Sequence, residues 1–480
     1  MINPIHHSPA GLWFILAVIS VYRDVPPIFQ GSIKTGTHQF RDNTGSCLRK
    51  TVMRYLYSFL WWFALPFVLL RIWWRGRREP GYRQHIPERL GFYPAVPAAA
   101  QRLWIHAVSV GETRAAEPLV RALMAAFPDS QILLTCMTAT GRETGAGLFA
   151  KEIQSGKLIQ SFLPYDTGTM MSRFIRHFRP VLCVLMETEI WPNLIHQCVS
   201  HQVPLALVNA RLSERSLRKG RKFRSIMEEA ARGFSAVAAQ TQTDADRLSE
   251  FGANQIAVTG SVKFDVRPPE DRLQKGQQLR HAIGDRPVLM CASTRLGEEP
   301  QLLDALSLLQ EDALLLLVPR HPQRFNEVAQ MVEERGIPMA RRSTLDDGFL
   351  TGIPAETRIL LGDSMGEMFM YYAACDLTFI GGSLEKLGGQ NLIEPCAVGK
   401  PVLIGPHTFN FEAITEDAIK AGAAIRIQSA KELMEQANRL LSDPDLRHNM
   451  GQVARQFAEH QHGATERTIQ LLAPLVRNRD

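Results

Sequence analysis

The stretch HAVSVGETRAAEPLV, residues 106–120, decides the fold. It starts inside an apolar run, IHAVSV, that is typical of a buried strand, and it runs into AAEPLVRALMAAF, which has the pattern of a helix. A buried strand that turns directly into a helix is the repeating unit of a parallel sheet covered on both faces. Glu112 puts a carboxylate at this turn, where such sheets bind their ligands.

The same alternation continues on both sides of a polar linker at residues 266–286. Before the linker, apolar runs stand at 131–140, 180–189, 203–211, 233–241 and 255–264. After it, they stand at 287–294, 313–322, 357–363, 375–383 and 400–406. We therefore predict an α/β fold of two Rossmann-like, doubly wound domains facing across a cleft, with the first at 79–265 and the second, with C-terminal helices, at 287–480.

Composition narrows the class of protein. Of the 480 residues, 45% are hydrophobic and 21% are charged, which is ordinary for a globular chain. The net charge of +6 is concentrated in two basic runs, 71–83 and 211–224, and this favours anionic partners. The run 211–224 holds a single aromatic residue, Phe223, and the sequence shows no known nucleic-acid-binding module, so nucleic acid is not expected as a partner. The seven cysteines lack CxxC spacing, which predicts buried thiols and neither a disulfide framework nor a zinc site.

A membrane segment is expected before the first domain. YLYSFLWWFALPFVLL, residues 55–70, is apolar and rich in tryptophan and tyrosine, with arginines on both flanks. These features predict a membrane anchor or a deeply seated interfacial helix over 53–78, with the basic side and the domains after it in the cytoplasm. Residues 1–52 are expected to be a mis-called or disordered extension, because Met53 directly precedes the anchor.

The second half carries the stronger signal for a ligand. FIGGSLEKLGGQNLIEPCAVGKPVLIGP, residues 379–406, reads as strand, two glycine pairs, helix and strand. Glycines such as Gly382 let backbone amides approach a phosphate. Glu394 lies one turn into the predicted helix, where its carboxylate can accept hydrogen bonds from ribose hydroxyls. The alternative is a turn with a packing glycine. Two glycine pairs favour a nucleotide-sugar site.

Other strand ends offer further polar groups. Within PRHPQR, residues 319–324, the side chains of Arg320, His321 and Arg324 can hold a phosphate, although a solvated basic loop is the alternative. The remaining groups at predicted strand ends are Lys263, Ser293, Thr294 and the loop GDSMGEM at 362–368.

Glu187 and Glu189 stand in METEIWPN, residues 186–193, at the end of another predicted strand. Strand alternation would point both side chains to one side. Favourable acids at a helix N-terminus are the alternative, and both interpretations stay open. A metal site is not expected, because the sequence has no DxD between apolar runs and no histidine pair at helical spacing.

Taken together, these motifs identify a family. From about Met53 to the C-terminus the sequence resembles the bacterial 3-deoxy-D-manno-octulosonic acid (Kdo) transferases. The motifs that carry the resemblance, in order, are RGRREPGYRQHIPERLGFY, HAVSVGE, TATGRETG, METEIWPN, NARLSERS, TGSVKFD, PRHPQR, GDSMGEM and GGSLEKLGGQNLIEP.

The resemblance implies an inverting, metal-independent glycosyltransferase of the GT-B type without a cofactor. It would transfer Kdo from CMP-Kdo to a lipid A precursor, a tetra-acyl disaccharide bisphosphate, at the cytoplasmic face of the bacterial inner membrane. The number of Kdo residues added stays open. The resemblance implies Glu112 as general base and Glu189 as a second essential acid, and Glu187 stays an alternative for that second role.

The resemblance also implies the residues that hold the donor. The residues that would hold CMP are Arg320, Met365, Gly366, Glu367, Asn391 and Glu394. Lys263 would face the donor phosphate or the Kdo carboxylate. Four further residues are expected in the donor site because they stand at the ends of predicted strands: Gly382, Ser293, Thr294 and His321. From charge alone, Arg211 and Ser213 are expected to meet the phosphates of the acceptor.

Two other classes stay as rivals. A lipid A disaccharide synthase or a nucleotide-sugar epimerase would share the fold, but an epimerase would not need the anchor. A membrane-tethered sensor of an anionic ligand would keep the phosphate-binding loop and would have no use for Glu112.

Overall fold

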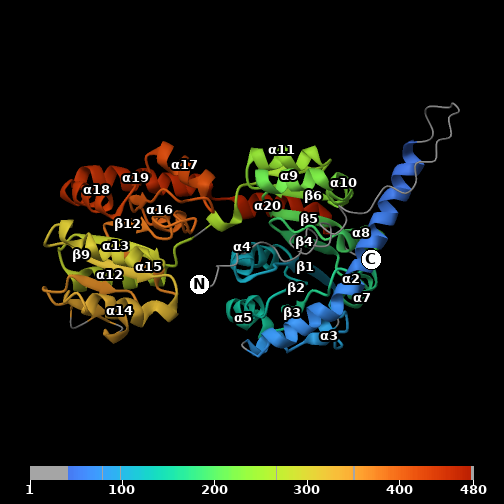
Figure 1. Ribbon diagram of the computed structural model, residues 1–480, viewed down its shortest axis with the longest axis horizontal. Coiled ribbons are helices and arrows are strands. Elements are labelled where there is room, and N and C mark those ends of the chain that lie inside the picture. Colours follow the sequence, from blue (N-terminus) through green and yellow to red (C-terminus); the bar gives the residue numbers. More distant parts are fainter. Residues whose placement is uncertain are drawn as a thin grey trace. The chain divides into compact units, whose positions relative to one another are not determined.

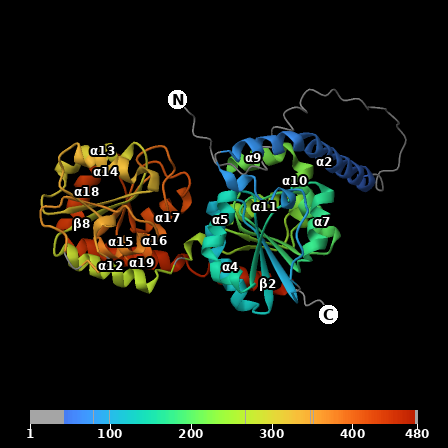
Figure 2. The same cartoon turned by 90° about the horizontal axis from the view of Figure 1, so that it is seen from below.

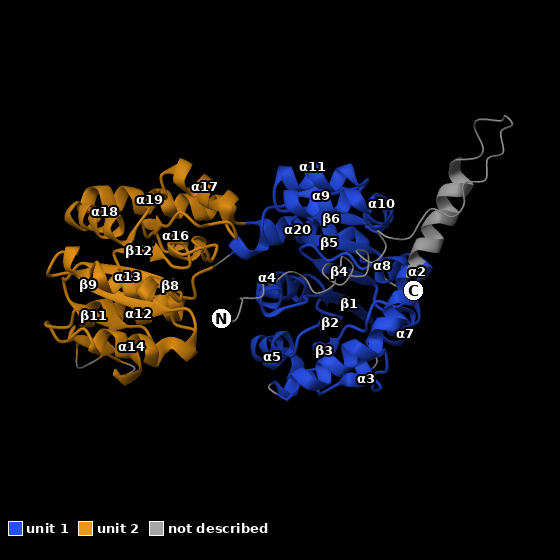
Figure 3. Ribbon diagram, in the orientation of Figure 1, with its two compact units in different colours: residues 1–265, 463–480 blue, residues 266–462 orange. Residues whose placement is uncertain are grey.

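The computed structural model describes residues 42–77, 79–97, 99–265, 267–346, 348–349 and 352–476. The chain divides into two compact units (Figure 3). Unit 1 consists of residues 1–265 with 463–480, and unit 2 consists of residues 266–462. Of the extension expected at residues 1–52, residues 1–41 lie outside the described residues.

Unit 1 is built on a parallel sheet of seven strands in the order β3-β2-β1-β4-β5-β6-β7. The order reverses between β1 and β4, as in a doubly wound sheet. The strands are β1 Gln101–His106, β2 Ser130–Cys136, β3 Leu158–Phe162, β4 Leu182–Met186, β5 Leu205–Ala210, β6 Ala236–Ala239 and β7 Ile256–Val258. Two short helices precede β1, η2 Pro80–Tyr82 and α3 Ile86–Arg89, and η3 Val262–Phe264 follows β7. The helices between the strands are α4 Val110–Ala126, α5 Ala139–Leu148, α6 Ala150–Gln154, α7 Gly168–Phe178, α8 Pro192–Ser200, α9 Glu214–Lys222, α10 Arg224–Gly233 and α11 Gln242–Glu250.

Alternate side chains of this sheet build two cores. On one face Trp104 and Leu185 pack in a cluster that includes residues of α7, α8 and α10. On the other face Leu103 and Val184 pack with residues of α4. Because both faces are covered, strands such as β4 (LCVLM) carry apolar residues on both sides, and this is why apolar runs identified them in the sequence.

The last helix, α20 (Ala464–Leu472), belongs to unit 1. Its Ile469 and Leu472 join the core beside α4. At the return point the carboxylate of Asp265 accepts a hydrogen bond of 2.6 Å from the backbone N–H of Gly463. The second unit therefore ends at residue 462 and not at 480 as expected, because α20 finds its apolar partner on the first sheet.

Unit 2 repeats the architecture with seven parallel strands in the order β10-β11-β9-β8-β12-β13-β14. The strands are β8 Val288–Thr294, β9 Leu314–Pro319, β10 Met339–Arg341, β11 Ile359–Leu361, β12 Leu377–Ile380, β13 Val402–Ile404 and β14 Ala424–Arg426. The helices are α12 Glu270–Ile283, α13 Glu298–Asp304, η4 Leu306–Leu308, η5 Pro322–Arg324, α14 Phe325–Glu333, η6 Arg342–Thr344, α15 Met368–Ala374, α16 Ile393–Ala397, α17 Glu412–Ala421, α18 Ala430–Ser442 and α19 Pro444–Gln461. The predicted fold class of two Rossmann-like units is confirmed.

The expected anchor forms the C-terminal part of a long helix, α2 (Asp42–Arg75), which lies beside α8 and α10 (Figures 1 and 2). Tyr57, Trp61 and Leu65, four residues apart, are buried in the core of unit 1. The segment Tyr57–Arg75 is long and apolar enough to cross a membrane. Large apolar side chains remain exposed along the rest of the helix: Tyr55, Phe59, Trp62, Phe63, Phe67, Leu70, Trp73 and Trp74.

Candidate active site

Glu112 lies in the first turn of α4, directly after the carboxyl end of β1. Its carboxylate folds back on the turn that precedes the helix. Oε2 accepts a hydrogen bond of 2.7 Å from the backbone N–H of Val108, and Oε1 accepts one of 3.3 Å from the hydroxyl of Ser109. These two bonds fix the side chain at the edge of the sheet, where the sequence predicted a functional carboxylate.

The surroundings of Glu112 raise its pKa to about 7 from the ordinary value of 4.5. Burial is the largest cause and the charge of Glu187 is the next, while the bonds from Val108 and Ser109 and the charge of Lys263 oppose them. A carboxyl group with this pKa exchanges its proton near neutral pH, as a general base must.

Glu187 follows β4, which ends at Met186. Its φ of 61° is left-handed, so the extended strand ends before Glu187. The carboxylate of Glu187 lies 2.5 Å from the ammonium nitrogen of Lys263.

Glu189 is buried, with only 3% of its surface exposed. Burial raises its pKa well above the ordinary value, and the nearby charges of Glu112 and Glu187 add to this, while the indole of Trp191 opposes it. The buried site therefore favours the protonated form of Glu189, which can donate a hydrogen bond.

Lys263 is held in place by η3 after the last strand of the sheet. The side-chain oxygen of Asn209, at the end of β5, accepts bonds of 3.0 Å from the Ser261 hydroxyl and 3.3 Å from the Val262 N–H. Asn209 was missed from the sequence, and the Asn-Ala-Arg that ends this predicted strand was its only signal. Lys263 was expected to face the donor, whereas its contact here is Glu187.

The two expected acceptor residues lie at the start of α9. The Ser213 hydroxyl accepts a hydrogen bond of 3.2 Å from the backbone N–H of Ser216, so Ser213 caps this helix. Arg211 is exposed just before it. Unit 1 therefore brings Glu112, Glu187 and Lys263 together, and it leaves Arg211 on the surface.

In unit 2 the expected donor residues stand at the ends of β8 and β9. Thr294 is buried, and its hydroxyl has no hydrogen-bond partner within the described part of the chain. Ser293 has a left-handed φ of 58°. The backbone N–H of Arg320 donates a bond of 2.9 Å to the carbonyl of Thr294, so these two strand ends lie side by side.

The basic side chains after β9 differ in their surroundings. Arg320 and His321 are exposed. Burial and the neighbouring arginines, Arg295 first, lower the pKa of His321, so the ring is neutral at pH 7. Arg324 forms an ion pair of 2.6 Å with the buried Glu299, which fills the role that a phosphate was expected to play for this arginine.

The first glycine pair is organised by Glu298, a residue that the sequence reasoning missed. The carboxylate of Glu298 accepts hydrogen bonds of 2.6, 3.0 and 3.0 Å from the backbone N–H groups of Gly382, Ser383 and Leu384. These amides were expected to face a phosphate, and the buried carboxylate occupies them instead. Gly381 packs tightly, since a Cβ there would lie 2.6 Å from the carbonyl of Ser293.

Two further groups of expected donor residues form contacts within unit 2. Glu367 pairs with Arg342 at 3.0 Å and accepts a hydrogen bond from the Ser364 hydroxyl, while Met365 is 60% exposed and Gly366 has a φ of 78°. In the other group the side-chain oxygen of Asn391 accepts a bond of 3.0 Å from the Ile393 N–H. The Asn391 amide also donates a long bond of 3.5 Å to Glu394, in the first turn of α16.

Comparison with known proteins then decides the family. The sequence model described as 3-Deoxy-D-manno-octulosonic-acid transferase (kdotransferase) matches residues 84–266, and that of glycosyl transferases group 1 matches residues 350–457. The 3-deoxy-D-manno-octulosonic acid transferase of Bordetella pertussis is 45% identical over 419 residues, which are 85% of this chain and 96% of the relative. The chain belongs to the Kdo transferase family.

A second relative agrees. The 3-deoxy-D-manno-octulosonic acid transferase of Haemophilus influenzae is 37% identical over 435 residues, covering 88% of this chain and 99% of the relative. The resemblance predicted from the motifs is therefore confirmed, and so is the prediction that the chain is a glycosyltransferase.

A solved structure confirms the fold. A UDP-N-acetylglucosamine 2-epimerase from Listeria monocytogenes aligns with a TM-score of 0.52 at 17% identity, covering 80% of this chain and 98% of that one. At this identity the likeness concerns the GT-B-like fold alone. The epimerase considered from the sequence shares this fold, while the identity of the chain to Kdo transferases over most of its length separates the two.

Proposed function

We propose that this chain transfers Kdo from CMP-Kdo to the tetra-acyl disaccharide 1,4'-bisphosphate precursor of lipid A, with inversion and with Glu112 as general base. Membership of the family supports the transfer of Kdo. One observation supports the base: Glu112 sits at the carboxyl edge of the sheet, with a pKa raised to about 7. A base of this pKa is half ionised at neutral pH and still strong enough to accept the proton of a sugar hydroxyl.

The two other glutamates take different parts in the proposal. Burial raises the pKa of Glu189 well above its ordinary value and favours its protonated form, so in the proposal Glu189 acts as a hydrogen-bond donor. Glu187 raises the pKa of Glu112, and Lys263, paired with Glu187 at 2.5 Å, moderates that effect. Together they keep the pKa of the base near the working pH. Lys263 can exchange this partner for the donor's phosphate or carboxylate when the donor binds.

We assign the donor to unit 2. Its leaving group is a monophosphate ester, which cationic side chains and helix amides can neutralise without a metal ion that bridges two phosphates. The exposed Arg320 beside the unpartnered hydroxyl of Thr294 supports this assignment, as does Glu394 at the start of α16. The proposed donor site also includes Ser293, His321, Gly382, the loop Met365–Glu367 and Asn391, which lies beside Glu394.

We assign the lipid acceptor to unit 1 and the location to the cytoplasmic face of the inner membrane. One face of α2 is buried on the unit and the other exposes Phe59, Trp62 and Phe67. Such a half-docked aromatic helix suits insertion into one leaflet of an anionic membrane. Arg211 and Ser213 stand at the start of the basic α9, where the acceptor's phosphates can bind.

The test is a transfer assay with mass detection. Purified wild type and Glu112→Gln would be incubated with CMP-Kdo, generated in place, and the tetra-acyl precursor. A Kdo increment for the wild type and none for Glu112→Gln, with CMP still bound by both, is expected. Transfer by both proteins would remove Glu112 as the base, and no transfer by either would overturn the choice of donor and acceptor.

A further inference from the structure

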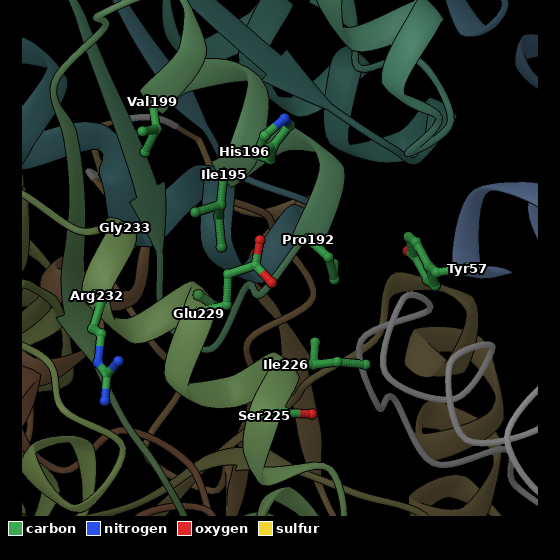
Figure 4. Close-up of a pocket in the computed structure, with 11 residues that line it drawn as sticks. Tyr57, Pro192, Ile195, His196, Val199, Ser225, Ile226, Glu229, Arg232 and Gly233 are labelled. Atoms are coloured by element: carbon green, nitrogen blue, oxygen red, sulfur yellow. The ribbon is translucent and has the colours of Figure 1, made fainter. Parts of the chain in front are cut away.

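Two adjoining pockets lie in unit 1. The larger one, of about 250 Å³, lies between α8 and α10, and Tyr57 of α2 forms part of its wall. Figure 4 shows Pro192, Ile195 and Ile226 around one space, with Tyr57 on the far side. The pocket therefore begins at the helix that carries the exposed aromatic face.

The smaller pocket, of about 50 Å³, continues towards the candidate site. It is lined by Thr188 and Ile190, the chain neighbours of Glu187 and Glu189. Pro192 and Ile226 line both pockets, so the two adjoin, and together they are called the path below. That path runs from α2 to the loop that bears the two glutamates.

The walls of the path favour an apolar occupant. Ile195, Val199 and Ile226 line the larger pocket, and Phe223 and Met227 line the smaller one. Val199 is 56% exposed, so the pocket presents apolar surface to its surroundings. The charged side chains of Glu229 and Arg232 also line the larger pocket, one of each sign.

We propose that this path binds one acyl chain of the lipid acceptor, a subsite that rests on the proposed function. A lipid whose sugar must reach Glu112 has to be lifted partly out of the bilayer. Each methylene group that leaves the bilayer must then contact an apolar protein surface to stay out of water. The path supplies that surface between α2 and the loop 187–190. Lys219, at the smaller pocket, supplies a cation where the acceptor's phosphorylated sugar would emerge.

The first test fills the larger pocket. Ser225 lines it and is exposed at its edge, so Ser225→Trp places a large ring there at little cost to folding. Ser249→Trp, an equally exposed serine on α11 outside both pockets, is the matched control. We expect Ser225→Trp to raise the KM for the tetra-acyl acceptor about tenfold, the loss of about two buried methylene groups, with kcat unchanged. Equal effects of the two variants, or none, would overturn the proposal.

The second test locates the chain directly and does not depend on turnover. The full-length protein in nanodiscs would be irradiated with an acceptor analogue that carries a diazirine at the end of one acyl chain, and the labelled peptides would be identified by mass spectrometry. Label on residues 192–199 or 223–233 is expected. Label confined to α2 would overturn the pocket while leaving the proposed transfer standing. Equal label from a diazirine phospholipid would make the path a general lipid site and also overturn it.

Discussion

Replacing Glu112 with glutamine should abolish transfer and at the same time stabilise the fold above neutral pH. Glutamine has the shape of the protonated acid. Its oxygen can accept the bond from the Val108 N–H, and its amide can donate to the Ser109 hydroxyl, so both contacts of the side chain survive. The substitution removes a negative charge from a site that raises the pKa of the carboxyl group and so destabilises its ionised form.

The magnitude follows from the pKa of Glu112, which is about 7 in the folded chain against an ordinary value of 4.5. Each pKa unit corresponds to about 1.4 kcal/mol, so the ionised carboxylate destabilises the folded state by at most about 3 kcal/mol. Partial exposure of the side chain reduces this to about 2 kcal/mol. Since the folded state holds the proton more tightly than the unfolded chain, this cost is absent below pH 4.5, grows between pH 4.5 and 7, and is constant above pH 7.

The assay is thermal unfolding of wild type and Glu112→Gln at pH 5 and pH 8, with transfer measured on the same samples. At pH 8 the variant should unfold about 4 °C or more above the wild type, and at pH 5 most of the difference should vanish. Transfer should fall by about 10²–10⁴-fold, the usual contribution of a general base. Glu117→Gln, on the exposed part of the same helix, is the control and should show no gain. A variant that is no more stable at pH 8 would refute the reasoning from burial.

Three further outcomes are expected. The kcat/KM of the wild type should fall about tenfold for each pH unit below about 7, and a profile that is flat from pH 5.5 to 8 would argue against Glu112 as base. Lys263→Met should move this acid limb to higher pH, because the charge of Lys263 lowers the pKa of Glu112; rates across the same pH range test this. Glu298→Gln should lower the stability of unit 2 by about 2 kcal/mol, since backbone amides lose their acceptor; chemical denaturation that shows no change would contradict the role of Glu298.

The fold could be predicted largely from apolar runs, and the strands that escaped were short. β10 and β14 have three residues each and form the two edges of the second sheet. β3, at the edge of the first sheet, has the mixed sequence LIQSF, because an edge strand is less completely covered. An edge strand needs fewer apolar residues, so its pattern resembles that of a loop. The return of α20 to unit 1 escaped for a different reason, since an amphipathic helix does not reveal which sheet covers its apolar face.

Candidate residues at the ends of apolar strands could be picked out from the sequence. Residues whose role depends on hydrogen bonds to distant parts of the chain could not. Glu112 became a candidate because the end of an apolar strand is visible in the sequence, and its role stays a prediction. Glu298 stands in the first turn of α13, where acids are common, so nothing local indicates that it holds the backbone of residues 382–384. Asn209 was missed for the same reason, because its partners lie more than fifty residues later, at Ser261 and Val262.

The three glutamates of unit 1 show why the sequence left the base and the second acid only partly resolved. Each follows a strand that ends at the same edge of one sheet, so position alone makes them equivalent. Their environments do not. Glu189 is buried, which raises its pKa well above the ordinary value, and Glu187 pairs with a lysine. Glu112 is partly exposed and has a pKa of about 7, raised in part by the charge of Glu187. In the proposed mechanism the pKa of Glu112 therefore depends on both neighbours, so the role of base would belong to the group and not to one residue.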